Sequence, residues 1–212
     1  MASVGTGGGR AVRHVDEPIS DDERAAIARV DNNALIVRLL FTINHLSRWL
    51  SPVHDPVRLE RAVYRGEPSV KDLLIGMRDH ELAIFPRVHL IAVHDNPDLD
   101  QLADPESTAA RHATDRARTT IALLSEFRRL RQSTCAVLRA LPDAGWRREG
   151  TSRRRHDVTI RTLAESLAEH DLRTLRVMDE TLDRVGAREG LAQLQTAHLD
   201  ELLKLVPERM TI

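Results

Sequence analysis

Apolar residues recur at three- and four-residue spacing through several long segments of the chain, which is typical of helices that bury one face. The clearest case is the segment 159–185, where the set is Ile160, Leu163, Ala164, Leu167, Leu175, Met178, Leu182 and Val185. Three polar residues, His170, Asp171 and Thr174, stand where the pattern calls for apolar side chains. Burying a polar group without a partner costs roughly 1–3 kcal/mol. The polar step therefore predicts satisfied polar partners, a water-lined pocket or a metal.

Two other predicted helices begin at capping boxes, in which a polar side chain and an acidic residue three positions later bind each other's backbone amides. Ser20 and Glu23 form one such pair, which opens a helix expected over residues 21–50. Ser69 and Asp72 form the other and open a second helix. Both starts are predicted from sequence spacing alone.

The second helix carries two features that set it apart. His80 and Glu81 interrupt its inner face, and Pro86 within the pattern should kink or split it. A third helix is expected over residues 107–141 and a short fifth over 191–205. Four long amphipathic helices predict an all-α, up-and-down four-helix bundle with a short additional C-terminal helix. Such bundles build their sites from side chains on facing helices, where the two polar interruptions would meet.

Composition excludes several classes of function. The chain has 212 residues, with 31 basic and 32 acidic side chains and a net charge of -1, so no general attraction to nucleic acid or anionic membrane is expected. No apolar run approaches the roughly 20 residues of a membrane span, and the N-terminus lacks the apolar core of a signal peptide. A cytoplasmic protein is expected.

The single cysteine, Cys135, excludes an intrachain disulfide and is interpreted as a small core residue. The expected organisation is a flexible Gly-rich tail over residues 1–19, the bundle over 20–186, and a C-terminal helix and tail over 187–212.

Three stretches carry a resemblance to a known family. They are SVKDLLIGMRDHE at residues 69–81, HDNPDL at 94–99, and a set that runs from Phe127 through Trp146 and Thr159 to HDLRTL at 170–175. Together they resemble the DinB-like (YfiT-like) bundle proteins over about residues 20 to 186.

The resemblance implies a four-helix bundle, often dimeric, in which many members hold a divalent metal with three histidines. One comes from the second helix and two come from an H-x-x-x-H pair on the last bundle helix. Characterised members include thiol-dependent transferases and isomerases that use bacillithiol or mycothiol, and others are proposed metal-dependent hydrolases. This chain departs from the pattern at two of three positions. His170 matches, but Thr174 replaces the second histidine, Gly76 replaces the histidine of the second helix, and His80 lies one turn further along.

Three interpretations of these residues stay open. His80, Glu81, His170 and Asp171 could form a remodelled site for Zn, Ni, Mn or Fe, since imidazole and carboxylate groups bind these ions. The same residues could instead form a buried hydrogen-bond network inherited from a metal site, with no metal bound. The third interpretation is a metal-free pocket for a small molecule or a low-molecular-weight thiol.

Five arginines fall in the loop 146–156, where Arg153 and Arg154 are candidates for receiving an anionic cofactor or substrate at the mouth of the bundle. The alternative is a solvated loop in an arginine-biased chain. Taken together, the sequence favours a non-catalytic or small-molecule-binding homodimer with a degenerate metal site. The other hypothesis is a metal- or thiol-dependent transferase, isomerase or hydrolase.

Overall fold

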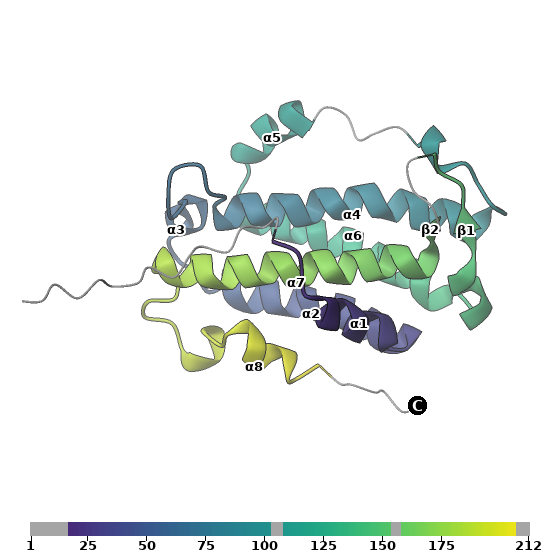
Figure 1. Ribbon diagram of the computed structural model, residues 1–212. Coiled ribbons are helices and arrows are strands. Elements are labelled where there is room, and N and C mark those ends of the chain that lie inside the picture. Colours follow the sequence, from purple (N-terminus) through teal and green to yellow (C-terminus); the bar gives the residue numbers. More distant parts are fainter. Residues whose placement is uncertain (1–16, 103–107, 154–157, 207–212) are drawn as a thin grey trace, which may run out of the picture.

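Four long helices form a bundle in the computed structural model, which describes residues 17–102, 108–153 and 158–206 (Figure 1). They are α2 (Asn32–Leu50), α4 (Val70–Val93), α6 (Thr120–Ala140) and α7 (Ile160–Arg184). Shorter helices and turns connect and flank them: α1 (Asp21–Arg29), α3 (Pro56–Glu60), η1 (Leu99–Gln101), α5 (Thr108–Arg116), η2 (Asp143–Arg147), η3 (Gln193–Gln195) and α8 (Leu199–Leu203). The predicted all-α class is confirmed, but the predicted up-and-down order is wrong. The neighbouring helices α4 and α6 run in the same direction, since Arg78 contacts Glu126 and, further along both helices, Glu81 contacts Arg131.

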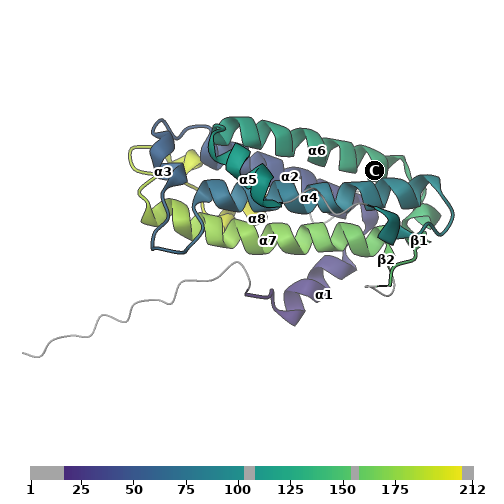
Figure 2. The same cartoon turned by 90° about the horizontal axis from the view of Figure 1, so that it is seen from above.

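The four long helices sit at the corners of a square. Both α2 and α4 pack against α6 and α7, so α2 and α4 lie at opposite corners (Figure 2). Apolar side chains from all four helices fill one continuous core between them. Helix α1 lies along α7, and α8 also contacts α7. No helix among the described residues is long and apolar enough to cross a bilayer.

Both predicted capping boxes are confirmed. The Glu23 amide donates to the Ser20 hydroxyl at 3.2 Å, and the Ser20 amide donates to the Glu23 carboxylate at 3.0 Å. Ser69 and Asp72 make the same reciprocal pair at the start of α4. These local bonds satisfy amides that the first helical turn leaves without partners, which is why sequence spacing locates both starts.

Two helices predicted as continuous are broken. The segment 21–50 divides into α1 and α2 because Asp31 caps a new helix, accepting from the Ala34 amide at 2.7 Å. The segment 107–141 divides into α5 and α6 at Thr119, whose hydroxyl accepts from the Ala122 amide at 3.2 Å. In both cases a short polar side chain binds the backbone locally and competes with continuation of the helix.

Pro86 does not split α4, which continues to Val93. Proline removes one backbone donor, but Ile84 and Val88 on either side are buried in the core and hold the helix in place. The predicted fifth helix is shorter than expected, since only α8 and a 3₁₀ turn form there.

A small two-stranded ladder was not predicted. The strands β1 (Glu149–Gly150) and β2 (Val158–Thr159) pair antiparallel, with Glu149 opposite Thr159. Strands of two residues are too short to show the alternation by which a sequence reveals them.

Candidate functional site

A buried arginine lies at the centre of the bundle. Arg131 of α6 is 1% exposed. Its Nε donates to Oε2 of Glu81 on α4 at 2.7 Å. Its Nη1 and Nη2 donate to the Asp171 carboxylate of α7 at 2.5 and 3.0 Å. One guanidinium therefore binds two carboxylates that are themselves buried, on two different helices.

Neighbouring polar groups complete this network. The Nη1 of Arg131 also donates to the Leu39 carbonyl of α2 at 3.1 Å. The Thr42 hydroxyl donates to the Asp171 carboxylate at 2.8 Å. The Thr134 hydroxyl donates to the Glu81 carboxylate. The guanidinium carbon lies 5.0 Å from the centre of the Phe127 ring. Every long helix thus contributes to what we call the Arg131 network, namely Arg131, Glu81, Asp171, Thr42 and Thr134.

The electrostatics of the network hold Arg131 in its charged form. Burial acts to lower the pKa of Arg131, but the charges of Asp171 and Glu81 outweigh it and raise that pKa well above its ordinary value. Buried charges of this kind are tolerated when each is paired and its remaining hydrogen-bonding positions are filled. Nearby, burial raises the pKa of Cys135 to about 12, so the thiol stays protonated at neutral pH. Cys135 is a core residue, as predicted.

The two histidines form a separate feature, which we call the imidazole pair. His80 of α4 and His170 of α7 stack with ring centres 4.2 Å apart and planes 17° from parallel. Burial lowers the pKa of His80, and burial, followed by the repulsion that a protonated His80 would exert, lowers the pKa of His170 to about 3. Both rings are therefore neutral at neutral pH and stack without charge repulsion.

Polar atoms around the imidazole pair are left without partners. Nε2 of His80, Nδ1 of His170 and the Thr174 hydroxyl are all buried, and none has a hydrogen bond within the described residues. Thr174 lies one turn from His170, and Gly76 lies one turn from His80. A Cβ added at Gly76 would meet no described atom within 4 Å. The positions that the family resemblance assigns to metal ligands thus hold an unpartnered hydroxyl, at Thr174, and an exposed glycine, Gly76.

The four residues predicted as a metal site do not form one ligand set. Glu81 and Asp171 both bind Arg131, which the prediction did not include. The rings of His80 and His170 face each other, whereas two histidines that share an ion must aim their nitrogens at one point. Within the described residues, no three His, Cys, Asp or Glu side chains are grouped so that they could hold a metal. These residues do not fit a metal as arranged, and metal binding itself stays a prediction.

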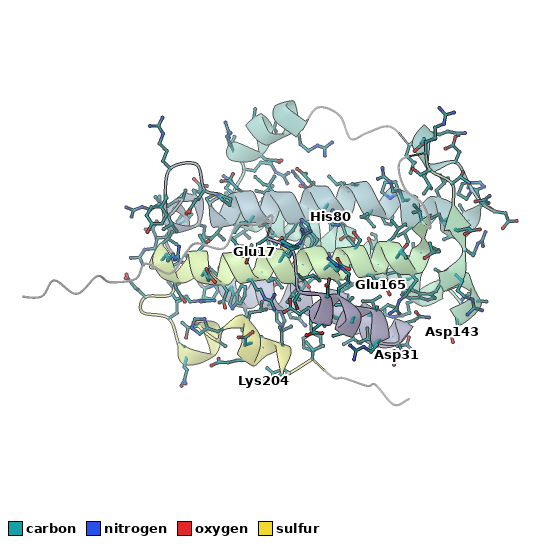
Figure 3. All side chains as sticks on the ribbon, in the orientation of Figure 1. Glu17, Asp31, His80, Asp143, Glu165 and Lys204 are labelled. Atoms are coloured by element: carbon teal, nitrogen blue, oxygen red, sulfur yellow. The ribbon has the colours of Figure 1, made fainter. Side chains whose placement is uncertain are left out.

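The two predicted anion-binding arginines are not both described. Arg153 is exposed beside β1, where its backbone amide donates to the Asp100 carboxylate at 2.8 Å. Arg154 lies outside the described residues. Figure 3 shows His80 near the middle of the bundle, and Arg153 has no described contact with the imidazole pair. An anion-binding role for these arginines stays a prediction.

Sequence reasoning missed Arg131, although a signal for it existed. Phe127, Arg131, Thr134 and Cys135 follow the spacing of one helix face, so the arginine occupies a core position of α6. It is the same kind of polar interruption that singled out Asp171 on α7. In a chain rich in exposed arginines, this one did not stand out.

Comparisons with known proteins support the fold. No model of a known protein family matches the chain, and no curated protein sequence does. Among solved structures, the chain is similar to YfiT from Bacillus subtilis, described as "a probable metal-dependent hydrolase with an unusual four-helix bundle topology". The identity is 17%, the TM-score is 0.61, and the match covers 80% of this chain and 91% of that one. The predicted DinB-like (YfiT-like) bundle is confirmed as a fold.

Proposed function

We propose that this chain is a non-catalytic binding protein with the YfiT-like fold, in which the Arg131 network has replaced metal chemistry. The observation that carries the proposal is that Arg131 binds both buried carboxylates, Glu81 and Asp171. A carboxylate already neutralised by a buried guanidinium is a poor ligand, since binding a metal would leave the arginine buried without its partner. The two imidazoles that remain supply fewer donors than the three or four of ordinary zinc sites.

A small molecule at the imidazole pair is the second part of the proposal. Nε2 of His80, Nδ1 of His170 and the hydroxyl of Thr174 are buried hydrogen-bonding groups that lack protein partners in the described part of the chain. Buried polar groups of this kind normally find a partner. A ligand that enters past the exposed Gly76, one turn from His80, would supply it. A low-molecular-weight thiol such as mycothiol or bacillithiol is the ligand class that the family resemblance favours.

The alternative function, a metal- or thiol-dependent transferase or hydrolase, draws on the same unpartnered atoms and on the description of YfiT. Metal analysis separates the two. We expect protein purified without added metal or a polyhistidine tag to contain far less than one metal ion per chain. One retained equivalent that is lost in His170→Ala would establish the metal-dependent alternative instead.

A gain-of-function variant tests the same point from the other side. Gly76→His with Thr174→His restores imidazoles at the two positions where the chain departs from the family pattern. We expect this double variant to bind one Zn²⁺ or Ni²⁺ in an isothermal titration, and Gly76→Ala with Thr174→Ala to bind none. Circular dichroism confirms that both variants are helical. A folded double-histidine variant that binds no metal would mean that these positions do not correspond to the family's ligands.

Ligand binding and assembly need their own measurements. Calorimetric titration of the wild type with mycothiol or bacillithiol should show saturable binding. His170→Ala should weaken the affinity at least tenfold. If the wild type binds neither thiol, the thiol assignment is refuted. The chain is also proposed to be a homodimer, which light scattering coupled to size-exclusion chromatography measures directly.

A further inference from the structure

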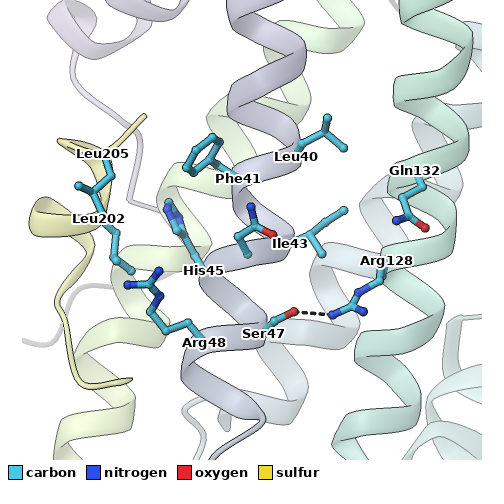
Figure 4. A pocket seen from close by; sticks show the side chains of 11 residues that line it. Leu40, Phe41, Ile43, His45, Ser47, Arg48, Arg128, Gln132, Leu202 and Leu205 are labelled. Atoms are coloured by element: carbon cyan, nitrogen blue, oxygen red, sulfur yellow. Dashed lines mark hydrogen bonds between the residues drawn. The ribbon is translucent and has the colours of Figure 1, made fainter. Parts of the chain in front are cut away.

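A hollow of about 540 Å³ lies on the outer side of α2, between α6 and the C-terminal segment that contains α8 (Figure 4). Its size falls within the range of roughly 300–1,000 Å³ that is usual for small-molecule sites. The residues that line it come from helices other than α4, and the imidazole pair is not among them. A ligand bound in this hollow is therefore independent of the proposed function.

One end of the hollow carries unneutralised positive charge. Arg48 of α2 and Arg128 of α6 both line it, and the Arg128 guanidinium donates to the Ser47 hydroxyl at 2.6 Å. Neither arginine forms an ion pair with a described carboxylate, and the described lining includes no Asp or Glu. Because two guanidinium groups line the hollow and no described carboxylate does, the hollow is electrostatically complementary to an anion.

A buried histidine beside these arginines also lacks a partner. His45 is 4% exposed and lines the hollow, and its Nδ1 is buried with no hydrogen bond in the described chain. Burial, with the charges of Arg48 and Arg38 in support, lowers its pKa to about 4. At neutral pH the ring is uncharged, so it adds a hydrogen-bonding group without adding to the charge. Such an unpartnered group in a cavity wall points to a ligand.

The other end of the hollow is apolar. Leu40 and Phe41 of α2 face it, with Leu202 and Leu205 from the C-terminal segment on the other side. Leu205 is 61% exposed, an unusual state for a large apolar side chain beside a cavity. Figure 4 shows Leu40, Phe41 and Leu205 toward one end and Arg48, Ser47 and Arg128 toward the other, with Leu202 beside Arg48. Apolar and cationic groups are thus separated along the hollow.

We propose that this hollow binds a small amphiphilic anion, a carboxylate attached to an apolar chain. The carboxylate binds at the end of the hollow that Arg48 and Arg128 line, where a planar guanidinium group matches its two oxygens. The chain lies along Phe41 and Leu205 and removes their apolar surface from water. A site with charge alone would bind any anion, and a site with apolar surface alone would bind any apolar molecule. The combination of the two defines the ligand class.

Isothermal titration with decanoate tests the proposal on the full-length protein. Three probes isolate its parts: decanol keeps the chain without the charge, acetate keeps the charge without the chain, and decyltrimethylammonium reverses the charge. We expect decanoate to bind saturably with one site per chain. Each of the other three should bind at least about tenfold more weakly, since each loses one of the two attractions.

Substitutions locate the site. Arg48→Gln with Arg128→Gln should weaken decanoate binding at least about tenfold, because charge-assisted hydrogen bonds to the carboxylate are lost. Arg129→Gln is the matched control, since Arg129 is an exposed neighbour of Arg128 on α6 that does not line the hollow. It should bind decanoate as the wild type does. Phe41→Ser should weaken binding of decanoate but leave the weak binding of acetate unchanged.

Three outcomes would overturn the proposal. Equal binding of decanol and decanoate would show a merely apolar surface. Equal losses in Arg129→Gln and in the Arg48/Arg128 double variant would show a general charge effect. A dimer that Phe41→Asp converts to monomers, together with no decanoate binding by the wild type, would assign this face to a second copy of the chain. Melting curves of each variant exclude unfolding as the cause.

Discussion

Replacing Arg131 by methionine tests the central claim about the bundle. The side chain is 1% exposed and donates four hydrogen bonds, to Glu81, to Asp171 twice and to the Leu39 carbonyl. Methionine fills much of the same space but leaves two buried carboxylates without a cation. Breaking a buried ion pair by removing one partner costs about 3–5 kcal/mol. That is a large part of the roughly 5–15 kcal/mol that stabilises a typical domain.

The same reasoning predicts that removing the whole network is much less harmful. Arg131→Met with Glu81→Met and Asp171→Leu leaves no charge in the Arg131 network, and replacement of a complete buried ion network by apolar residues is neutral or stabilising by roughly 1–4 kcal/mol. The triple variant should therefore be more stable than the single variant, although it loses more polar contacts. Arg129→Met on the exposed side of α6 is the control and should change stability by less than about 0.5 kcal/mol.

Urea unfolding followed by far-ultraviolet circular dichroism measures all three variants. For a chain of this size each kcal/mol corresponds to about 2–4 °C in melting temperature, so Arg131→Met should melt roughly 6–20 °C below the wild type. A loss below about 1 kcal/mol would refute the view that Arg131 neutralises buried carboxylates. So would a triple variant that is less stable than Arg131→Met alone.

Two further predictions concern packing and pH. Leu167→Ala, at a fully buried position of α7, should lower the free energy of unfolding by about 2–5 kcal/mol in urea titrations, and a loss under about 1 kcal/mol would contradict the assigned face. The folded pKa values of His45 and His170, about 4 and about 3, lie below the ordinary 6.5. The stabilisation that each neutral histidine contributes is therefore complete above pH 6.5. As the pH falls from 6.5 toward the folded pKa, the free energy of unfolding decreases by about 1.4 kcal/mol per pH unit for each histidine. His170→Leu should reduce the slope of stability against pH by one such increment, and an unchanged slope would refute the assignment.

The sequence predicted the bundle because its information is local and periodic. Apolar stripes gave the four long helices, and two capping boxes located helix starts to the residue. The breaks at Asp31 and Thr119 were missed because the apolar stripes continue on either side of each cap. A helix-capping residue within an apolar stripe differs from an ordinary exposed polar residue only in the hydrogen bond that its side chain accepts from a backbone amide. The spacing of residues in the sequence does not reveal that bond.

The site was only partly predictable for a different reason. The polar steps at His80 and His170 indicated that two facing helices meet there, and the rings do stack. Which partner Asp171 takes depends on α6, forty residues earlier in the chain, and no local pattern links the two. Arg131 became recognisable only when packing placed it between the two carboxylates.

The forked contacts of Arg131 also bear on how the helices are aligned along their length. Two helices that pack only through apolar side chains can slide past each other by one turn, about 5.4 Å, and still bury most of their apolar surface. The guanidinium of Arg131 has no equivalent second position. A slip of one turn would separate its N–H donors from their acceptors on three neighbouring helices at once. We therefore expect the charge-free triple variant to keep its helices and its heat resistance while sampling several offsets, visible as broadened amide resonances.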